Sequence, residues 1–426
     1  MRVVGSHVGR HALDAPRKPR LCCRVSHRFA EKSPIDTPSH APTTGPLAGL
    51  RVLDLSRVLA GPLCTMILGD LGADVVKVER PAGGDETRQW GPPWVGGAEG
   101  RESAYFLSIN RNKRSVTADF GSTEDREFIR ALAVEADVVV ENFAPRTLDR
   151  WGLDHESLSA ANPRLVYCTI TGYGREGGEA QRPGYDFAIQ ARAGWMAVTG
   201  EPEGEPVKVG VAVVDVLTGQ NAAIGILAAL AERERSGRGQ RLEVALIDSA
   251  LAGLVNVSQA ALAGVPARRF GNAHATIVPY QSFATADRPI VVTVGNDEQW
   301  RRFCQAIGRS DLADEPRFAT NPNRVERRDE LIPLLADALA GRGSEAWLEG
   351  LEAAGVPCAP VRLVEEAVDD PAIRGRGGIW EMSGSGYGSV EIVGSPIRLE
   401  RTPAGVHRPA PRLGEHTEVV RRQRWA

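Results

Sequence analysis

The fold of this chain is constrained most by short runs rich in Val and Ile that alternate with longer segments of helical character. Residues 74–80 (DVVKVER), 137–143 (DVVVENF) and 165–171 (LVYCTIT) are such runs. Strands that are apolar on both faces are typical of parallel sheets whose two sides are covered by helices. Because strands and helices alternate along the chain, we expect βαβ units and a large Rossmann-like α/β domain built on a parallel sheet.

This alternation extends over residues 47–265. A Ser followed by acidic residues favours a helix start at Ser122, and Gly237 is a typical helix stop. Besides the three runs above, the pattern predicts strands at 51–56 and 241–247, and helices at 57–72, 122–136, 215–237 and from the last strand to about Gly264.

The pattern changes at about residue 266. We expect a smaller α+β domain over 266–371, and a C-terminal segment, 372–426, that returns to the large domain. The smaller domain is predicted to contain a hairpin at 276–296, helices at 297–308 and 327–355 and an extended piece at 356–361. In the C-terminal segment, strands are predicted at 378–383 and 390–399.

Residues 1–46 differ from the rest of the chain. They carry eight Lys or Arg against three Asp or Glu, and they hold four of the eight His. Apolar periodicity is absent, so we interpret the segment as a disordered extension. An Arg-rich, acid-poor segment is also typical of a mitochondrial transit peptide, and that alternative stays open.

Charge and cysteine usage exclude several classes of partner. The net charge of −3 favours neither nucleic acid nor an anionic membrane. No uncharged apolar run reaches the roughly 18 residues that a membrane helix needs. The six cysteines, of which only Cys22 and Cys23 are adjacent, form no metal-ligand or disulfide pattern. We therefore expect no bound metal and a cytoplasmic location, or the mitochondrial matrix if residues 1–46 are a transit peptide.

Two sequence features are weak functional signals. Residues 172–178 (GYGREGG) match G-x-G-x-x-G, but no clear helix follows and the acidic residue of a dinucleotide site is missing. A glycine-rich surface loop is the better interpretation. The chain has no G-x-S-x-G nucleophile elbow and no H-E-x-x-H zinc motif. Among the histidines, His274 stands out because it lies among Gly and Asn in a predicted loop.

Asp215 interrupts an apolar run, VAVVDVLTGQ, where a helix is predicted to begin. One interpretation is helix capping, because Asp is among the preferred N-cap residues. The other is nucleophilic catalysis by a carboxylate, which we expect to stay charged because the helix N-terminus favours the anion. The small neighbours Thr218 and Gly219 would leave room for an acyl group. Composition alone does not choose between these interpretations.

Longer motifs point to a family. LAGLRVLDLSRVLAGPLCTMILGDLGADVVKVERPAGGDETRQWGPP, NRNKRSVTADF, DVVVENFAP, GYGREGGEAQRPGYDFAIQA and VVDVLTG follow one another. Their content and order resemble the class III CoA-transferases, the family of formyl-CoA and carnitine CoA-transferases, over about residues 47–420. Within it, GNAHATIVPYQSF and GYDFAIQARAG look closest to succinyl-CoA–glutarate CoA-transferase.

The resemblance implies an activity and an assembly. Asp215 would be the catalytic nucleophile, passing through an aspartyl mixed anhydride and an aspartyl-CoA thioester. The substrates would be an acyl-CoA, such as succinyl-CoA, and a small free carboxylic acid, such as glutarate. No permanently bound cofactor is implied, because the coenzyme A thioester is itself a substrate. The family also forms interlocked homodimers, so we expect one here.

The resemblance also assigns site residues by position. Contacts to CoA are implied for Leu59, Ala60, Arg80, Ala118, Asn142, Phe143 and Arg150. Positions near the acyl group are implied for Trp90, Tyr105, Tyr185 and Asp186, and His274 becomes a candidate substrate residue. His274 lies in the region that corresponds to a glycine-rich loop of the formyl-CoA enzymes. From charge alone, Arg268 or Arg269 is a candidate for holding a distal carboxylate.

Two other functions stay open. α-Methylacyl-CoA racemases share the fold. Where this chain has the tripeptide GYD, at 184–186, their sequence resembles GHD. Tyr185 lacks the pKa of a general base near neutral pH, which makes racemisation the second choice. A non-catalytic CoA-binding protein is the third.

Overall fold

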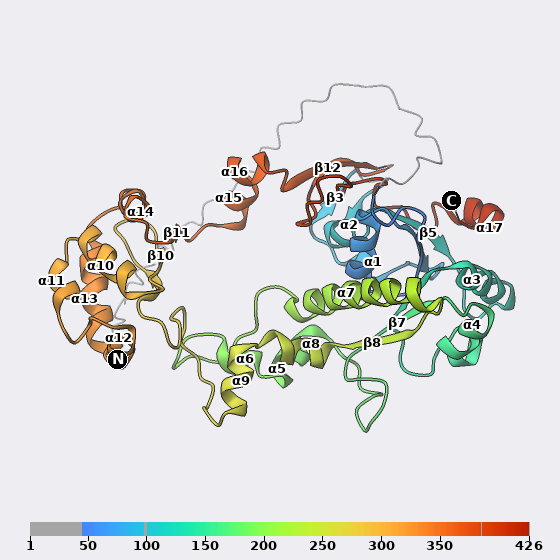
Figure 1. The fold of residues 1–426 in the computed structure, drawn as a ribbon. Coiled ribbons are helices and arrows are strands. Elements are labelled where there is room, and N and C mark those ends of the chain that lie inside the picture. Colours follow the sequence, from blue (N-terminus) through green and yellow to red (C-terminus); the bar gives the residue numbers. More distant parts are fainter. Residues whose placement is uncertain (1–44, 98–99, 385, 426) are drawn as a thin grey trace, which may run out of the picture. The chain divides into compact units, whose positions relative to one another are not determined.

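A single parallel sheet organises the computed structural model, which describes residues 45–97, 100–384 and 386–425 (Figure 1). Six strands lie in the order β5-β2-β1-β6-β7-β8, and each neighbouring pair is parallel. The strands are β1 (Arg51–Asp54), β2 (Asp74–Glu79), β5 (Lys113–Thr117), β6 (Val138–Glu141), β7 (Val166–Thr171) and β8 (Arg241–Ala245). This confirms the expected α/β sheet.

The edge strand β5 is the one that the apolar pattern did not predict. Its sequence, KRSVT, is too polar to stand out, yet Lys113 and Arg114 are both buried. Charged groups are tolerated inside a protein only when they are paired. The Lys113 ammonium lies 3.0 Å from the carboxylate of Asp54, and Arg114 pairs with Asp74.

Two hydrophobic clusters show that helices cover both faces of the sheet. On one face, α1 (Ala60–Asp70) and α7 (Val213–Ser236) pack on Val52, Val138 and Val166. On the other, α3 (Thr123–Glu135) and α4 (His155–Ala161) pack on alternate residues of the same strands. The C-terminal helix α17 (Thr417–Gln423) joins this second cluster through Val420.

The long helix α7 is apolar and lies partly in the core. By length and composition alone it is the one helix of the described residues that could cross a membrane. Nine of its residues are buried against the protein, among them Val214, Ala222, Ile226 and Leu230. Burial in the core accounts for part of its composition, whereas Ile224 of the same helix is 63% exposed.

Two helices predicted as continuous are interrupted. The segment after β8 forms α8 (Leu246–Gly253) and α9 (Asn256–Leu262), which are separated at Val255, whose φ is 43°. The predicted helix at 327–355 is α13 (Arg328–Ala340) followed by α14 (Ser344–Ala353). Apolar periodicity continues across the first interruption, which hid it. At the second, Gly341 and Gly343 are stop signals that the prediction of one long helix passed over.

A third hydrophobic cluster draws only on residues between 278 and 358. The predicted hairpin and extended piece are confirmed as an antiparallel sheet of β9, β10 and β11. The elements of this region are β9 (Tyr280–Phe283), β10 (Ile290–Thr293), α10 (Asp297–Ala306), α11 (Ser310–Asp314), α12 (Asn321–Glu326) and β11 (Cys358–Pro360). The domain boundaries at 265 and 371 stay predictions, and the extension predicted at 1–46 lies outside the described residues apart from Gly45 and Pro46.

The strands expected in the C-terminal segment pair with each other as an antiparallel hairpin. Met382 and Ile392 pack there against Phe106 and Leu107. The hairpin strands are β12 (Ile379–Gly384) and β13 (Gly388–Val393); the remaining elements are η1 (Glu86–Gln89), β3 (Trp94–Val95), β4 (Glu102–Ser103), α2 (Ala104–Ile109), η2 (Asp149–Trp151), α5 (Asp186–Arg192), α6 (Trp195–Val198), α15 (Val364–Val368) and α16 (Pro371–Gly375).

Candidate active site

A cavity of about 280 Å³ lies where the strand order of the sheet reverses. β2 and β5 follow on one side of β1, whereas β6, β7 and β8 lie on the other. The lining comes from residues 57–60 after β1, residues 142–145 after β6 and residues 170–172 at the end of β7. Open α/β sheets bind their ligands at such a switch point, outside the carboxyl ends of the strands.

This cavity brings together residues that lie far apart in the sequence. Six of the predicted site residues line it: Leu59, Ala60, Asn142, Phe143, Tyr185 and Asp215. The other predicted residues do not line the cavity, and their positions are given below. Their roles in binding and catalysis stay predictions.

Asp215 does not cap the helix that carries it, so the capping interpretation is wrong. α7 begins at Val213, with Ala212 in the N-cap position, so Asp215 is the third helical residue. The helix is capped by Asp186, whose Oδ1 accepts the N–H groups of Val214 at 2.8 Å and Asp215 at 3.4 Å. The Asp215 side chain therefore makes no capping hydrogen bond and lines the cavity.

The expectation that Asp215 simply keeps its charge is also wrong. Burial raises the pKa of this carboxyl to about 7, and the negative charge of Asp186 adds to the shift. The N-terminal end of α7 favours the anion, but it does not outweigh these two effects. At neutral pH the protonated and ionised forms of Asp215 are therefore of comparable population.

Tyr105 and Tyr185 lie beside this pair of carboxylates, and Trp90 packs on Tyr105. Burial, followed by the charges of Asp215 and Asp186, raises the pKa of the Tyr105 phenol to about 12. Tyr105 therefore stays protonated near neutral pH and can donate a hydrogen bond. Its ring meets that of Trp90 edge to face at 5.1 Å between centroids. Tyr185 precedes α5 and is 63% exposed at the cavity.

α7 approaches the start of α1 closely because residue 219 is a glycine. A Cβ at Gly219 would lie 2.6 Å from the carbonyl oxygen of Ala60, well inside van der Waals contact. Gly219 is four residues after Asp215 and so lies on the same face of the helix. This packing sets Asp215 opposite the backbone of Leu59 and Ala60.

The side chain of Asn142 is used to hold backbone. Its Oδ1 accepts the N–H of Arg57 at 3.0 Å, and its Nδ2 donates to the carbonyl of Arg57 at 2.8 Å. The loops after β1 and β6 are thus tied together at the cavity wall. Position in the sequence suggested a contact to CoA for Asn142, and this clamp was not foreseen.

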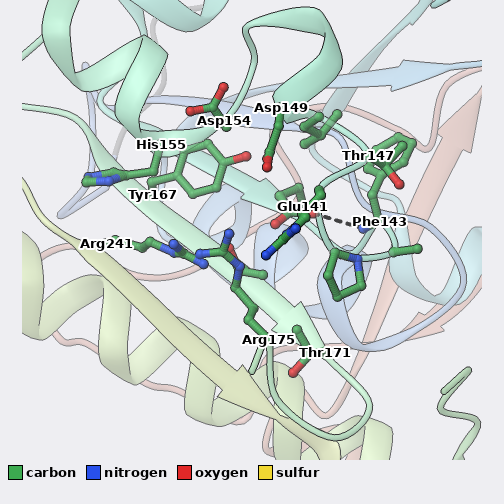
Figure 2. A pocket seen from close by; sticks show the side chains of 15 residues that line it. Glu141, Phe143, Thr147, Asp149, Asp154, His155, Tyr167, Thr171, Arg175 and Arg241 are labelled. Carbon is green, nitrogen blue, oxygen red and sulfur yellow. Dashed lines mark hydrogen bonds between the residues drawn. The ribbon is translucent and has the colours of Figure 1, made fainter. Parts of the chain in front are cut away.

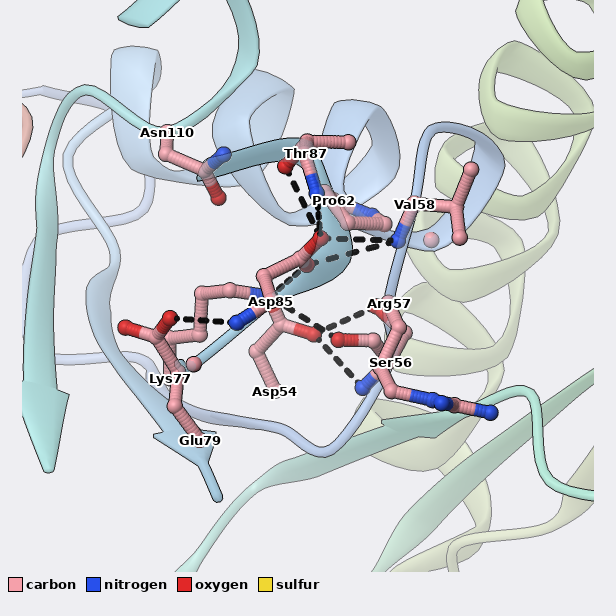
Figure 3. A network of polar contacts seen from close by, with 12 residues as sticks. Asp54, Ser56, Arg57, Val58, Pro62, Lys77, Glu79, Asp85, Thr87 and Asn110 are labelled. Carbon is pink, nitrogen blue, oxygen red and sulfur yellow. Dashed lines mark hydrogen bonds and ion pairs between the residues drawn. The ribbon is translucent and has the colours of Figure 1, made fainter. Parts of the chain in front are cut away.

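A charged network lies buried behind the same loop (Figure 3). Lys77 pairs with Asp85 at 2.9 Å, and Lys113 with Asp54 at 3.0 Å. Lys77 also donates to the carbonyl of Ser56 at 2.9 Å. No motif indicated this network, because its members are spread over strands and turns.

Arginine and aromatic side chains gather beside the cavity. The rings of Phe120 and Trp151 stack at 5.0 Å, and Phe143 meets Phe120 at 5.7 Å. The guanidinium groups of Arg57 and Arg150 lie about 6 Å from the rings of Phe143 and Trp151. Such a cluster offers flat surfaces and positive charge to an adenine nucleotide.

Ala118 and Arg80 do not line the cavity. Ala118 is buried just after β5. Arg80 is exposed at the end of β2, where its Nε donates to the carbonyl of Gly84 at 2.9 Å.

A smaller pocket adjoins the cavity around Glu141 (Figure 2). Burial raises the pKa of Glu141 to about 7, although its Oε2 accepts the N–H of Phe143 at 2.9 Å. Arg175 and Arg241 line the same pocket. Sequence reasoning missed Glu141, whose only signal was a carboxylate ending a buried strand.

His274 and the nearby arginines are not among the residues lining this cavity. The Nδ1 of His274 accepts the N–H of Thr276 at 3.1 Å, and its ring packs on Tyr280. Arg269 donates to the carbonyl oxygens of residues 201, 202 and 204, so it acts as a brace for that turn. Arg268 stacks on Phe270.

The described residues hold no group of three or more His, Cys, Asp or Glu side chains placed to bind a metal ion. Those that line the cavity include no histidine either. The groups that this arrangement does offer are the Asp215 carboxylate, as a nucleophile or acid–base group, the Tyr105 hydroxyl and backbone donors.

Comparison with known proteins gives concordant matches. The sequence model of CoA-transferase family III matches residues 47–417. A succinate–glutarate CoA-transferase of Agrobacterium fabrum is 43% identical over 388 residues, which cover 90% of this chain and 96% of that protein. A human succinyl-CoA:glutarate CoA-transferase is 40% identical over 376 residues, or 88% of this chain and 85% of that protein. The crystal structure of a CAIB/BAIF family protein from Brucella suis superposes with a TM-score of 0.81 at 43% identity, covering 89% of this chain and 99% of that one.

Proposed function

This chain belongs to CoA-transferase family III, and from that premise we propose that it moves CoA from succinyl-CoA to a free dicarboxylate such as glutarate. Membership confirms the resemblance found in the sequence and makes the chain a CoA-transferase. Acyl-CoA and carboxylate are accordingly the expected substrates. The donor, the acceptor and the route through Asp215 are the proposal.

The proposal depends on one observation: the side chain of Asp215 faces the cavity while Asp186 takes over the capping of α7. A carboxylate that serves no capping or ion-pairing role can form covalent intermediates. It lies where the carboxyl ends of β1 and β6 meet, which suits an acyl group delivered on a long cofactor.

The reaction would proceed in four balanced substitutions. The Asp215 carboxylate attacks the thioester carbonyl of the donor, the C–S bond breaks, and CoA thiolate leaves a mixed anhydride. The thiolate attacks the aspartyl carbonyl and releases the donor acid, which leaves an aspartyl-CoA thioester. The acceptor carboxylate attacks that carbonyl and expels the thiolate. The thiolate then attacks the acceptor acyl carbonyl, forming the new acyl-CoA and freeing Asp215.

Three features support this route. One thioester replaces another, so no external energy source is required. An oxyanion forms in each step, and donors held in place stabilise it; Tyr105 and the backbone at the start of α1 are candidates. The anhydride must also be kept from water, for which a site enclosed by several loops is suited.

The acceptor class is inferred from the relatives and from charge. Both relatives compared above are named for succinate or succinyl-CoA and glutarate. Arg57 and Arg182 line the cavity. Each is ion-paired at the surface, with Glu86 at 2.6 Å and with Glu179 at 3.2 Å, and either would exchange that partner for the second carboxylate of such an acid. Arg268 and Arg269 do not line the cavity, and Arg269 is held by the 201–204 turn, so neither is proposed for this role.

We also propose that the enzyme works as an interlocked homodimer in the cytoplasm. Large apolar side chains on α7 to α9 and near residue 364 are exposed, with Val255 at 69%, Leu262 at 82% and Val364 at 76%. Exposed apolar surface of this extent supports a protein interface. Light scattering should give the mass of two chains, and interlocked chains should not exchange subunits under native conditions. A monomer or rapid exchange would contradict this.

The central test is exchange of label from free dicarboxylates into the CoA thioester pool, read out by mass spectrometry against a panel of acids. Quenching during turnover and digestion should show the peptide that holds Asp215 carrying CoA or the acyl group. Asp215→Asn should abolish exchange and labelling, whereas Asp248→Asn, at an exposed carboxylate of α8, serves as the matched control.

Two results would redirect the assignment. Wash-out of α-deuterium from a branched acyl-CoA without any acceptor would indicate racemisation. CoA binding without exchange or wash-out would indicate a non-catalytic protein. Labelling of a residue other than Asp215 would contradict the mechanism but not the transfer.

A further inference from the structure

We propose that Asp85 is a positioning residue for bound acyl-CoA. Its carboxylate holds Val58 in a left-handed backbone conformation, and this fixes Leu59 and Ala60 at the wall of the cavity that faces Asp215. The inference rests on the CoA transfer proposed above and extends it to a residue that does not itself line the cavity.

Val58 has a conformation that its side chain disfavours. Its φ is 70°, in the left-handed region that a β-branched residue rarely adopts. Strained backbone of this kind persists only where its surroundings enforce it, and it gathers at ligand clamps and active sites. Val58 itself lines the cavity, directly before Leu59 and Ala60.

The enforcing contact comes from Asp85. The N–H of Val58 donates to both oxygens of this carboxylate, at 3.3 and 3.4 Å (Figure 3). The carboxylate is itself held in place, because Oδ2 pairs with Lys77 at 2.9 Å and Oδ1 accepts the hydroxyl of Thr87 at 2.8 Å. Asp85 is only 2% exposed, so water does not replace these contacts.

The residues before Val58 are held by other partners. Lys77 donates to the carbonyl of Ser56, and Asp54 accepts the Ser56 N–H at 2.9 Å. Arg57 is held by the Asn142 side chain. Within this loop only Val58 is held by Asp85. Lys77 also holds Ser56, so a variant that removes both charges loses that contact as well. A loss of affinity that appears only while residue 58 is a valine therefore belongs to Asp85.

Burying so many charges needs a reason beyond stability. Buried ion pairs are often no better than apolar residues of the same size, and one use of them is to specify a single conformation. Here the network of Asp54, Lys77, Asp85 and Lys113 surrounds one loop, and that loop forms a wall of the cavity. We infer that the loop is what the network specifies.

A mutant cycle tests this. The pair is replaced by Lys77→Met with Asp85→Leu, which removes the acceptor without leaving an unpaired buried charge. The replacement is made in the wild-type chain and in the Val58→Gly background, because glycine adopts positive φ without help. Kd for CoA is measured by calorimetry. We expect the replacement to weaken CoA binding about tenfold or more in the wild type, but less than about threefold in the glycine background.

A matched control separates positioning from general destabilisation. Arg111 and Asp70 form another buried pair, at 2.7 Å, at the opposite end of α1. Arg111→Met with Asp70→Leu should change the melting temperature. Val58→Gly should alter Kd for CoA by the same factor in this double variant as in the wild type. If the Asp85 variant does not fold, Asp85→Asn, which keeps the shape, replaces it in the cycle and should give a smaller loss of the same pattern.

Equal losses of affinity in both backgrounds would overturn the inference, since the conformation of Val58 would then be irrelevant. So would unchanged CoA binding in the folded double variant. Failure of the proposed function looks different, because the wild-type protein would then bind no CoA or transfer none.

Discussion

The carboxylate of Asp186 caps the helix that carries Asp215, and its charge raises the pKa of the residue that it positions. One group therefore exerts two opposite influences. It orders the first turn of α7 by accepting two backbone N–H groups, and it disfavours the ionised form that a nucleophile needs. The activity expected at a given pH depends on this balance.

The first prediction concerns the pH dependence of transfer. Only the ionised form of Asp215 can attack a thioester, and burial together with Asp186 raises its pKa to about 7. Activity should therefore increase as pH rises and level off above neutrality. We expect kcat/KM at pH 6 to be about tenfold below its plateau. A flat profile between pH 5 and 8 would show that Asp215 is already ionised in the free enzyme.

The second prediction separates the two effects of Asp186. Asp186→Asn keeps an oxygen that accepts the helix N–H groups but removes the negative charge, so the acidic limb of the pH profile should move to lower pH. Asp186→Ala removes the charge and the cap together, and it should also lower stability by about 1 kcal/mol. Rate profiles and thermal unfolding of both variants test this. Identical profiles for Asp186→Asn and the wild type would contradict the electrostatic effect.

The third prediction links catalysis to stability. In the unfolded chain Asp215 has an ordinary pKa near 4, whereas in the folded protein its pKa is about 7. Between these values the folded state binds more protons than the unfolded state, so stability falls as pH rises through this window. Asp215→Asn removes the titrating carboxyl group and, with it, this loss of stability at higher pH. The variant should gain ~1 kcal/mol or more of unfolding free energy at pH 8, and less at pH 5.

Denaturant unfolding at the two pH values measures the difference. Asp248→Asn, at an exposed carboxylate, should show little change at either pH. An Asp215→Asn protein that is destabilised at pH 8 would mean that the carboxylate forms a favourable contact when folded.

The fourth prediction concerns the clamp between Asn142 and Arg57. Both polar atoms of the amide hold the backbone of Arg57, so Asn142→Ala should free the loop after β1. A misplacement of about 1 Å in the groups that position a substrate costs up to 10²-fold in reaction rate. We therefore expect a weaker fit of the substrate, with KM for acyl-CoA raised ~10-fold or more. Stability should fall by only about 1 kcal/mol, since both hydrogen bonds are exposed and water can replace the lost partner. Unchanged KM in a folded variant would show that the loop is held without Asn142.

The alternation of strands and helices sufficed to predict the parallel sheet, because burial on both faces imposes a distinctive composition. It could not predict β5, whose Lys113 and Arg114 are buried only because they pair with Asp54 of β1 and Asp74 of the adjacent strand β2. Pairing across strands leaves no local signal. The break at Val255 was hidden because apolar periodicity continues past it. The break near Gly341 was marked by two glycines, Gly341 and Gly343, which the prediction of one long helix passed over.

The site shows the same division. Family motifs placed Asp215, Asn142 and Tyr185 at one cavity, and the structure brings them there. What Asp215 does locally could not be predicted, because the helix starts two residues earlier than expected and its cap comes from Asp186, 29 residues away in the sequence. The support behind the cavity, including Asp85, consists of tertiary contacts.

The last prediction uses two glycines of the same helix. A methyl group at Gly219 would meet the carbonyl oxygen of Ala60 at 2.6 Å, and backbone cannot easily move aside. At Gly225 it would meet the end of the Leu242 side chain at 2.7 Å, which can rotate. Gly219→Ala should therefore push α7 away from the start of α1 and lower kcat/KM about 10²-fold.

Gly225→Ala should keep activity, and the better helix propensity of alanine, about 1 kcal/mol, offsets the cost of moving Leu242. Kinetics and melting temperature of the two variants distinguish a local displacement from a general change in the helix. Equal activity in both would mean that the close approach of α7 to Ala60 does not position Asp215.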